Sequence, residues 1–269
     1  MTYKDYETLV IDFTGYVATV RMNRPEKLNA FDQIMGKELI KITDDLKNND
    51  DVRCIILTGT GRGFCSGVDL GQDRTPAKEN IFSRGMLDEH GFSGRVALAW
   101  NEIDKPTIAA INGVAAGGGL GLAMLQDIRI AAESARLIPI FSRRGIAPEL
   151  GMSWTTPNVI GYSKALEWFY TGDELSGQQA FDLGVANHVV EDVRLQEYAL
   201  ELATKISEWS SPIATRLTKR TVYASLNSDS LRQHLIYEAM NVGLGSSTED
   251  TVEGRTSIIE KRKPEFKGK

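Results

Sequence analysis

Two glycine-rich segments, each directly following a run of apolar residues, constrain the fold of this chain most strongly. They read CIILTGTGRGFCSGVDL (54–70) and TIAAINGVAAGGGLGLAM (107–124). An apolar strand that ends in glycines predicts a tight turn, because glycine tolerates positive φ and lets the backbone approach a ligand closely. We expect a helix to follow each turn, beginning near Asp69 in the first segment and near Gly119 in the second.

The two turns, at residues 63–67 and 113–121, are suited to holding a negative charge. The N-terminus of a helix presents unpaired N–H groups and a partial positive charge. Two such turns side by side would direct two backbone N–H groups at one developing negative oxygen, which is the arrangement of an oxyanion hole. The competing interpretation is that the glycines only make tight turns.

Neither turn carries one of the better-known glycine motifs. A P-loop needs GxxxxGK[ST], and the Lys-Ser/Thr pair is absent. Gly59, Gly61 and Gly63 alternate and so do not match the GxGxxG of dinucleotide-binding proteins. The sequence holds no GxSxG elbow, and its three histidines occur in no triad-like context. Cys65 lies beside the first turn, but no neighbouring histidine would activate it as a nucleophile.

Strand and helix patterns alternate along the first two hundred residues. The expected strands are 8–13, 16–22, 52–57, 106–111, 127–131 and 135–139. The expected helices in this part are 32–47, 95–103, 164–170 and 177–183. Repeated units of an apolar strand followed by a helix predict an α/β fold.

The last part of the chain changes character and shows only helical patterns. These cover residues 195–207, 212–226 and 230–242. We therefore divide the chain into a core that holds the site, residues 1–205, and a helical C-terminal region, residues 206–269. A helical region behind an α/β core is often used for packing against neighbouring subunits, which makes oligomerisation plausible.

Composition narrows the class of protein. The chain has 269 residues, enough for one large domain or for a domain with an appendage. Hydrophobic residues at 42% and charged residues at 25% argue against wholesale disorder. The net charge of −5 disfavours a nucleic-acid partner. Cys54 lies within an apolar run, which predicts a buried thiol rather than a disulfide and a reducing compartment.

Residues 1–13 and 106–126 bear on location. The first stretch carries charges where a signal peptide needs apolar residues, so we expect a cytoplasmic protein. The second contains no charged residue and has GxxxG spacing, which is also seen in membrane helices. Its five glycines between 113 and 121 suit a helix interior poorly, so we expect no membrane partner.

Four motifs together resemble the crotonase family, the enoyl-CoA hydratase/isomerases. They are NRPEKLNAF (23–31), GFCSGVDL (63–70), KPTIAAINGVAAGGG (105–119) and EKRKPEFKG (260–268). The motifs occur in the family's order and span almost the whole chain. The resemblance implies a crotonase-type spiral of ββα units with a helical C-terminal region, assembled as a homotrimer or a dimer of trimers. It also implies an acyl-CoA thioester substrate, no cofactor other than the CoA that the substrate carries, and no metal.

The resemblance assigns roles to particular positions. The thioester carbonyl would lie between the backbone amides of Ser66 and Gly118. Further substrate contacts are implied along both glycine turns and near them, at Ala30, Cys65, Gly67, Val68, Asp69, Leu70, Gly117, Gly121 and Phe141. Of these, Asp69 fits a helix cap better than a catalytic acid.

The CoA moiety would run along RPEKLNA, with Arg24 and Lys27 near its phosphates and Leu28 beside it. Lys261 and Phe266 would reach the nucleotide of a neighbouring subunit. The alternative for this basic tail is a solvated chain end, as most runs of charge are. Residues 72–94 are expected to form the wall of the acyl pocket, with Phe82, Met86 and Leu87 facing an apolar tail.

The hydratases of this family use two glutamates, and both positions differ here. They correspond to Gly121 and Phe141. Adding water across a double bond needs a paired acid and base, which puts standard hydratase activity in doubt.

A different carboxylate, Glu149 in GIAPELGMSW, resembles the single acid of the isomerase branch. It would remove a proton from C2 or C4, leave the enolate in the oxyanion hole, and return the proton at the other carbon. The alternative is that Pro148 and Glu149 simply form the first turn of a helix.

Three functional hypotheses follow from these positions. The first is an enoyl-CoA isomerase with Glu149 as its sole acid/base. The second keeps the enolate chemistry for another reaction, namely hydration, thioester hydrolysis, decarboxylation or C–C cleavage. The third is an acyl-CoA binder that has lost its catalytic acids.

Overall fold

The computed structural model describes residues 6–69, 71 and 89–269, and it contains two sheets. The larger sheet has six strands in the order β1-β2-β3-β5-β7-β10. Their bounds are β1 Leu9–Thr14, β2 Val17–Met22, β3 Cys54–Gly59, β5 Thr107–Ile111, β7 Ile128–Ala132 and β10 His188–Val190. β1 and β2 form an antiparallel hairpin, and every later pair in this sheet is parallel.

The smaller sheet has four short strands in the order β4-β6-β8-β9. They are β4 Gly63–Cys65, β6 Val114–Ala116, β8 Arg136–Ile138 and β9 Leu175–Ser176. β4, β6 and β8 are parallel, and β9 is antiparallel to β8. Each turn of the chain therefore places one strand in the large sheet and the next in the small one, as β3 then β4, β5 then β6, and β7 then β8. This alternation confirms the predicted α/β spiral of ββα units.

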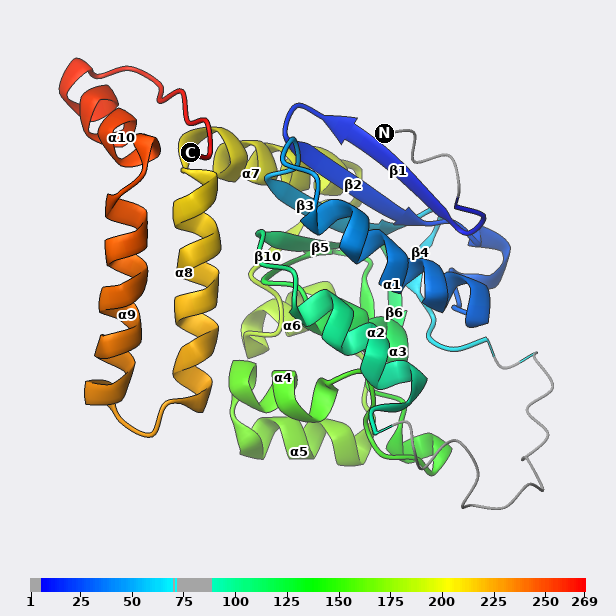
Figure 1. The fold of residues 1–269 in the computed structure, drawn as a ribbon. Coiled ribbons are helices and arrows are strands. Elements are labelled where there is room, and N and C mark those ends of the chain that lie inside the picture. Colours follow the sequence, from blue (N-terminus) through cyan, green and yellow to red (C-terminus); the bar gives the residue numbers. More distant parts are fainter. Residues whose placement is uncertain (1–5, 70, 72–88) are drawn as a thin grey trace.

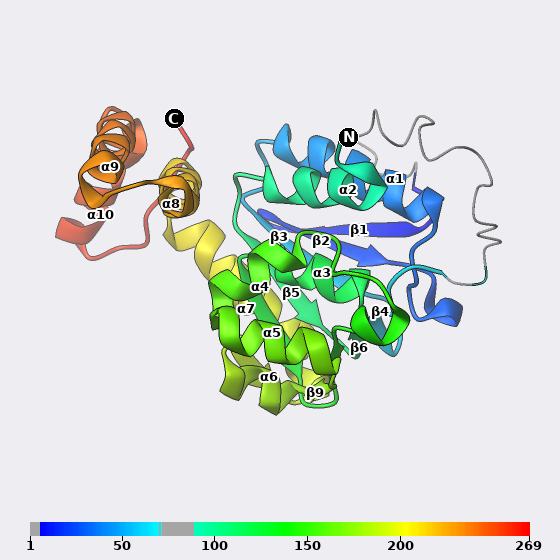
Figure 2. The same ribbon diagram turned by 90° about the horizontal axis from the view of Figure 1, so that it is seen from below.

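In the described part of the chain, the helices α1 to α7 accompany the sheets (Figures 1 and 2). They are α1 Gln33–Lys47, α2 Gly91–Asn101, α3 Gly118–Met124, α4 Met152–Ile160, α5 Tyr162–Thr171, α6 Gly177–Leu183 and α7 Leu195–Trp209. α1 begins where the Asp32 side chain accepts a hydrogen bond from the Met35 N–H at 2.9 Å, which is an ordinary N-cap. Its buried residues Met35, Leu39, Ile42 and Leu46 recur at helical spacing and join the main hydrophobic core.

The structure differs from the sequence-based expectations in two short strands and two additional helices. Both glycine segments contain a short strand, β4 and β6, because each continues from the large sheet into the small one. α4 was not expected, and neither was a helix over Glu249–Glu260. The proposed acyl wall falls almost entirely on residues 72–88, which lie outside the described part together with Leu70. The helix expected to begin near Asp69 would fall on the same residues outside the described part, and Asp69 itself follows an isolated bridge between Phe31 and Val68.

The uncharged segment 106–126 folds as β5, β6 and α3, all of which are packed into the core. Within the described part of the chain, no helix has both the length and the apolar character needed to span a membrane.

The C-terminal helices form an arm that leaves the core after α7 (Figures 1 and 2). They are α8 Pro212–Ala224, α9 Leu231–Ser246 and α10 Glu249–Glu260. Two ion pairs tie α8 to the core, Arg216 to Asp104 at 2.7 Å and Lys219 to Asp127 at 2.9 Å. The expected helical C-terminal region is thus present.

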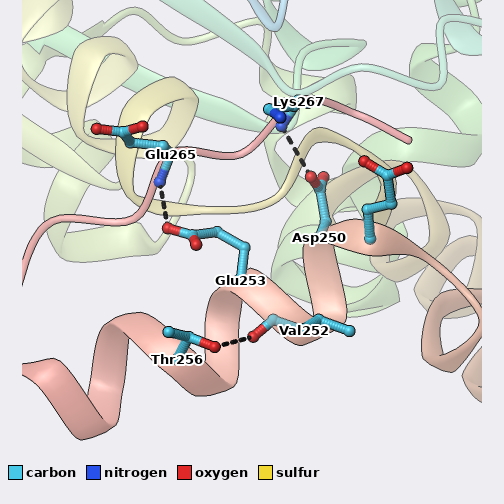
Figure 3. A pocket seen from close by; sticks show the side chains of 7 residues that line it. Asp250, Val252, Glu253, Thr256, Glu265 and Lys267 are labelled. Carbon is cyan, nitrogen blue, oxygen red and sulfur yellow. Dashed lines mark hydrogen bonds between the residues drawn. The ribbon is translucent and has the colours of Figure 1, made fainter.

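The chain end returns along α10 and is fixed there by backbone hydrogen bonds. The buried Asp250 carboxylate accepts the N–H groups of Lys267 at 2.8 Å and Gly268 at 3.1 Å. Glu253 accepts the N–H of Glu265 at 2.7 Å. Figure 3 shows the contacts of Asp250 with Lys267 and of Glu253 with Glu265, around a surface pocket that lies on the arm, away from the two glycine turns.

Candidate active site

The two glycine turns meet where β4 and β6 run side by side. Cys65 of β4 is paired with Ala115 of β6. A Cβ added to Gly119 would lie 2.0 Å from the Cys65 carbonyl oxygen, and one added to Gly67 would lie 2.7 Å from the Ala116 carbonyl oxygen. Neither distance is possible for a real side chain. Glycine at both positions therefore allows the two backbones to touch.

Ser66 does not offer its N–H to this junction. The Ser66 N–H donates to the Leu28 carbonyl oxygen at 3.0 Å, and the Ser66 hydroxyl donates to the Lys27 carbonyl oxygen at 3.2 Å. Both groups bind the turn after β2 and are therefore directed away from a ligand. This corrects the expectation that the Ser66 amide forms half of the oxyanion hole.

Val68, two residues further along the chain, has an N–H group that points away from the neighbouring segment. In the bridge between the two segments, Phe31 N–H donates to Gly67 O at 2.9 Å and Asp69 N–H donates to Phe31 O at 3.1 Å. In such a parallel pair, the N–H of the middle residue, Val68, faces the opposite side from Phe31.

Gly118 supplies the second unengaged N–H, as the first residue of α3. Among the residues that the structure describes, no backbone carbonyl accepts the N–H of Val68 or of Gly118. A Cβ added to Gly67 would lie 3.5 Å from the Gly118 nitrogen, so the two free donors sit on adjoining segments. Gly117, the N-cap of this helix, has φ of 51° and donates its own N–H to Ile138 O at 3.0 Å.

Two asparagines that the sequence interpretation did not single out hold the first turn in place. The side chain of Asn29, which is fully buried, donates to the carbonyls of Thr60 at 2.9 Å and Gly63 at 2.8 Å. Asn112 donates to Gly59 and Gly61, both at 2.9 Å. The signal was present in the sequence, since both asparagines fall inside the quoted motifs and can bind backbone groups in turns.

Arg24 has a different place from the one expected. Its guanidinium contacts Asp69 at 3.0 Å and Asp32 at 3.4 Å, and it also donates to the carbonyl of the buried residue Ala30. Because the Arg24 guanidinium forms ion pairs with both neighbouring carboxylates, it stabilises the fold and is not an exposed cation available to a phosphate.

Asp69 is held by Arg24 and by its own backbone turn. Its carboxylate accepts the Gly71 N–H at 3.0 Å. This hydrogen bond, together with the Arg24 side chain and the nearby Lys27 charge, lowers the pKa of Asp69 below its usual range. Asp69 is therefore a negatively charged residue that stabilises the turn.

Lys27 is exposed on the short 3₁₀ helix Pro25–Lys27, and Leu28 follows it in the left-handed conformation with φ of 50°.

The hydratase glutamate position at Gly121 has no room for a side chain. A Cβ added to Gly121 would lie 2.7 Å from Leu150 Cβ and 3.5 Å from the Glu149 carbonyl oxygen. Leu150 is buried in the left-handed conformation with φ of 54°. Its Cδ1 lies 2.9 Å from where a Gly118 Cβ would be, and the Phe31 ring lies 2.7 Å from the same point. Leu150 and Phe31 thus enclose Gly118, a role that sequence spacing did not reveal.

Phe141, the second hydratase position, is a core residue. It is almost fully buried, and its ring lies 3.9 Å from the position of a Gly117 Cβ. Phe141 therefore packs against the second glycine turn at Gly117.

Glu149 stands beside this enclosure. It is half-buried, and its Oε2 accepts a hydrogen bond from the Ser93 hydroxyl of α2 at 2.7 Å. α4 begins only at Met152, with Gly151 as N-cap. The interpretation of Glu149 as a first-turn helix residue is therefore wrong, because it lies in the loop that packs over Gly121.

Cys65 is buried, and burial raises the pKa of its thiol to about 12. The thiol stays protonated at neutral pH, which excludes it as a nucleophile. Within the described ranges, no cluster of three or more His, Cys, Asp or Glu side chains is placed to hold a metal ion.

The two residues expected to reach a neighbouring nucleotide lie on the arm. Phe266 is half-buried against Gly254 of its own α10, and its carbonyl oxygen accepts a hydrogen bond from Arg53 at 2.8 Å. Lys261 is exposed at the C-cap of α10. The site thus offers the backbone N–H groups of Val68 and Gly118 at the glycine junction, and the loop that carries Glu149 packs against Gly121.

Comparison with known proteins places this geometry in context. Residues 12–269 match the family model described as enoyl-CoA hydratase/isomerase. The chain is 35% identical to 1,2-epoxyphenylacetyl-CoA isomerase of Escherichia coli strain K12, over 94% of this chain and 95% of that protein. It is 33% identical to short-chain-enoyl-CoA hydratase of Clostridium acetobutylicum, over 97% and 98%. The crystal structure of enoyl-CoA hydratase from Bacillus anthracis superposes with a TM-score of 0.90 at 33% identity, covering 98% of this chain and all of that one.

Proposed function

This chain belongs to the enoyl-CoA hydratase/isomerase family, and we propose that it shifts a double bond, converting a 3-enoyl-CoA into a 2-enoyl-CoA. The observation that carries the proposal is Glu149, which has a half-buried carboxylate and stands in the loop whose backbone packs against Gly121. The second hydratase carboxylate position is taken by the buried Phe141. One carboxylate suffices for a double-bond shift, whereas hydration needs an acid and a base together.

We assign the oxyanion hole to the N–H groups of Val68 and Gly118. The Ser66 N–H is bound to Leu28, whereas no described backbone carbonyl accepts from Val68 or Gly118. Donors that are already oriented require no reorganisation when charge develops on the thioester oxygen. Removing one donor of this kind typically costs about 2.7–4 kcal/mol of transition-state stabilisation.

The proposed reaction has two proton transfers. Glu149 takes a proton from C2 of the 3-enoyl thioester, and the C–H electron pair moves into the thioester to form an enolate whose oxygen is held by the two N–H groups. The neutral Glu149 then returns the proton to C4. The electron pair of the C3–C4 double bond forms the new C4–H bond, the C1–C2 pair of the enolate becomes the C2–C3 double bond, and the oxygen pair re-forms the thioester carbonyl. The Glu149 carboxylate is restored. The net reaction consumes no water.

Leu150 supports isomerisation over hydration. Its side chain fills the space beside Gly121 where a second carboxylate would have to lie. The enclosure by Leu150 and Phe31 also lowers the local dielectric, which strengthens interactions with the enolate oxygen.

The experiment is to incubate the purified protein with a 3-enoyl-CoA and, separately, with a 2-enoyl-CoA, and to resolve the products by chromatography. We expect isomerisation without 3-hydroxyacyl-CoA, and a loss of about 10²–10⁴-fold in kcat for Glu149→Gln. The matched control is Glu167→Gln on exposed α5, which makes the same chemical change away from the site.

Each contrary result has a defined meaning. An untouched 3-enoyl-CoA overturns the isomerase proposal, and a 3-hydroxyacyl product from 2-enoyl-CoA favours hydration. Binding of acyl-CoA without turnover identifies an acyl-CoA-binding protein. Full activity of Glu149→Gln shows that another group is the base.

We also propose that the protein assembles as a homotrimer or as a dimer of trimers. Support comes from the arm, where large apolar side chains of α9 and α10 are exposed, among them Leu231, Ile236, Met240, Ile258 and Ile259. In that assembly Lys261 and Phe266 would approach a neighbouring subunit's CoA, with Lys27 and Leu28 along the chain's own CoA. The carbonyl of Leu28 already anchors the first turn through Ser66.

A further inference from the structure

The hydroxyl of Ser93 contacts the proposed base directly from another part of the fold. Ser93 is the third residue of α2, and its Oγ donates to Glu149 Oε2 at 2.7 Å. Both side chains are half-buried. The two residues are 56 positions apart in the chain, so the contact exists only because α2 packs beside the loop before α4.

Both partners of this hydrogen bond stand on well-supported backbone. The Phe92 ring packs on Gly36 of α1, where it occupies the place that a Gly36 side chain would take. One turn further along α2, Ala97 lies 3.8 Å from the position of a Gly151 Cβ. On the other side, the Glu149 carbonyl accepts the Met152 N–H at 3.2 Å, which anchors the loop to the start of α4.

A glutamate that moves a proton from one substrate carbon to another must hold one carboxylate oxygen in a fixed position near both carbons. The last torsion of a glutamate side chain is broad and poorly defined by sterics alone. A hydrogen bond to one carboxylate oxygen removes that freedom and leaves the other oxygen, here Oε1, to meet the substrate. Misplacement by about 1 Å can cost on the order of 10²-fold in rate.

The hydrogen bond also fits both halves of the reaction. When Glu149 is ionised, Ser93 donates to the Oε2 of a carboxylate. When Oε1 carries the transferred proton, Oε2 is the carbonyl oxygen of the acid and still accepts the same hydrogen bond. Ser93 therefore neither gains nor loses a proton, and the geometry is the same for removal at C2 and return at C4.

We propose that Ser93 is a positioning residue for Glu149, holding Oε2 so that Oε1 carries the proton between the two carbons. The inference rests on the proposed function, since it takes Glu149 as the base.

The test compares Ser93→Ala, Ser93→Thr, Glu149→Gln and the double variant Ser93→Ala/Glu149→Gln. Thermal unfolding first establishes that each variant is folded. We expect kcat to fall roughly 10- to 100-fold in Ser93→Ala while KM stays within about twofold, because binding of the CoA moiety does not involve this contact. Ser93→Thr retains the hydroxyl and is expected to recover most of the rate.

A second readout follows enolate formation independently of the product. Exchange of the C2 protons of butyryl-CoA with D₂O, measured by proton NMR, needs the base but no double bond. We expect the exchange rate to fall in Ser93→Ala by the same factor as kcat. The double variant should be no slower than Glu149→Gln alone, since a residue that acts through another adds nothing once that residue is gone.

The outcomes separate the two claims. If Glu149→Gln exchanges and isomerises at the wild-type rate, the proposed base is wrong. If Glu149→Gln is inactive but Ser93→Ala turns over like wild type, only the positioning role is overturned. A drop in Ser93→Ala that Ser93→Thr does not restore, or one that adds fully to that of Glu149→Gln, also overturns it.

Discussion

At the scale of single residues, the neighbouring glycines Gly118 and Gly119 differ in what surrounds them. A side chain at Gly119 would meet the Cys65 backbone, at 2.0 Å from its carbonyl oxygen. A side chain at Gly118 would meet only the ends of side chains, namely the Phe31 ring at 2.7 Å and Leu150 Cδ1 at 2.9 Å. Side chains can move aside more easily than backbone. A methyl group at Gly119 would therefore displace the backbone, whereas one at Gly118 would displace only side chains.

We therefore predict that Gly119→Ala loses stability and Gly118→Ala loses mainly activity. Gly119→Ala should lower the free energy of unfolding by about 3 kcal/mol or more, and Gly118→Ala by roughly 1–2 kcal/mol, as overpacking of side chains costs. Denaturant titrations and kcat/KM on both variants measure this. Equal stability losses, or full activity in Gly118→Ala, would contradict the assignment.

At the scale of elements, the Arg24–Asp69 pair joins the turn after β2 to the loop after β4. The pair is largely shielded from solvent, and Asp32 at the start of α1 is the third member. The first glycine turn is thus held by two kinds of interaction. One is this ion cluster, and the other is the set of hydrogen bonds that the Asn29 and Asn112 side chains donate to backbone carbonyls.

The depressed pKa of Asp69 predicts how this ion cluster responds to pH. A carboxyl whose folded pKa lies below its unfolded value, near 3.9 for Asp, contributes stability that is complete above the unfolded pKa. That contribution is lost as pH falls through the lower folded pKa, because the unfolded chain then binds the proton first.

We expect Asp69→Asn to be destabilised by about 1–3 kcal/mol at pH 7, as for hydrogen bonds to charged groups. The difference from wild type should shrink as pH drops below about 4. Urea titrations at a series of pH values measure this, with Asp229→Asn on the exposed α8–α9 connection as control. A difference that stays constant with pH would show that Asp69 does not contribute through its charge.

At the scale of the whole molecule, the arm of α8, α9 and α10 stands apart from the core (Figure 2). Its helices also expose large apolar side chains. Ile236 and Met240 of α9 are four residues apart, so they lie on one helix face, and both are more than 60% exposed. Apolar surface of this kind marks an interaction site on a folded protein.

We predict a particle of three or six chains of 29.7 kDa in sedimentation experiments. Replacing Ile236 and Met240 by Asp should reduce the mass toward that of a single chain, because charges are costly in a buried interface. Val193→Asp, at an exposed position outside the arm, is the control. A single chain in the wild type would contradict the proposed assembly.

The sequence by itself determined the fold class. Alternating apolar strands and amphipathic helices are local patterns, and the steric need for glycine at a close backbone approach is local as well. For that reason the α/β fold class, the helical C-terminal region and the close approach of the two glycine turns were predictable, whereas the spiral of ββα units followed from the resemblance of four motifs to the crotonase family. The role of Glu149 as the single acid stays a prediction from its motif.

Only the tertiary structure decided which groups at that junction are free to act. The Ser66 N–H is taken by Leu28, Arg24 is taken by two carboxylates, and Leu150 fills the space beside Gly121. Ser93 and Glu149 meet across 56 residues of chain. A hydrogen bond or a filled space depends on where distant segments are brought by packing, and no local pattern of residue types encodes that position.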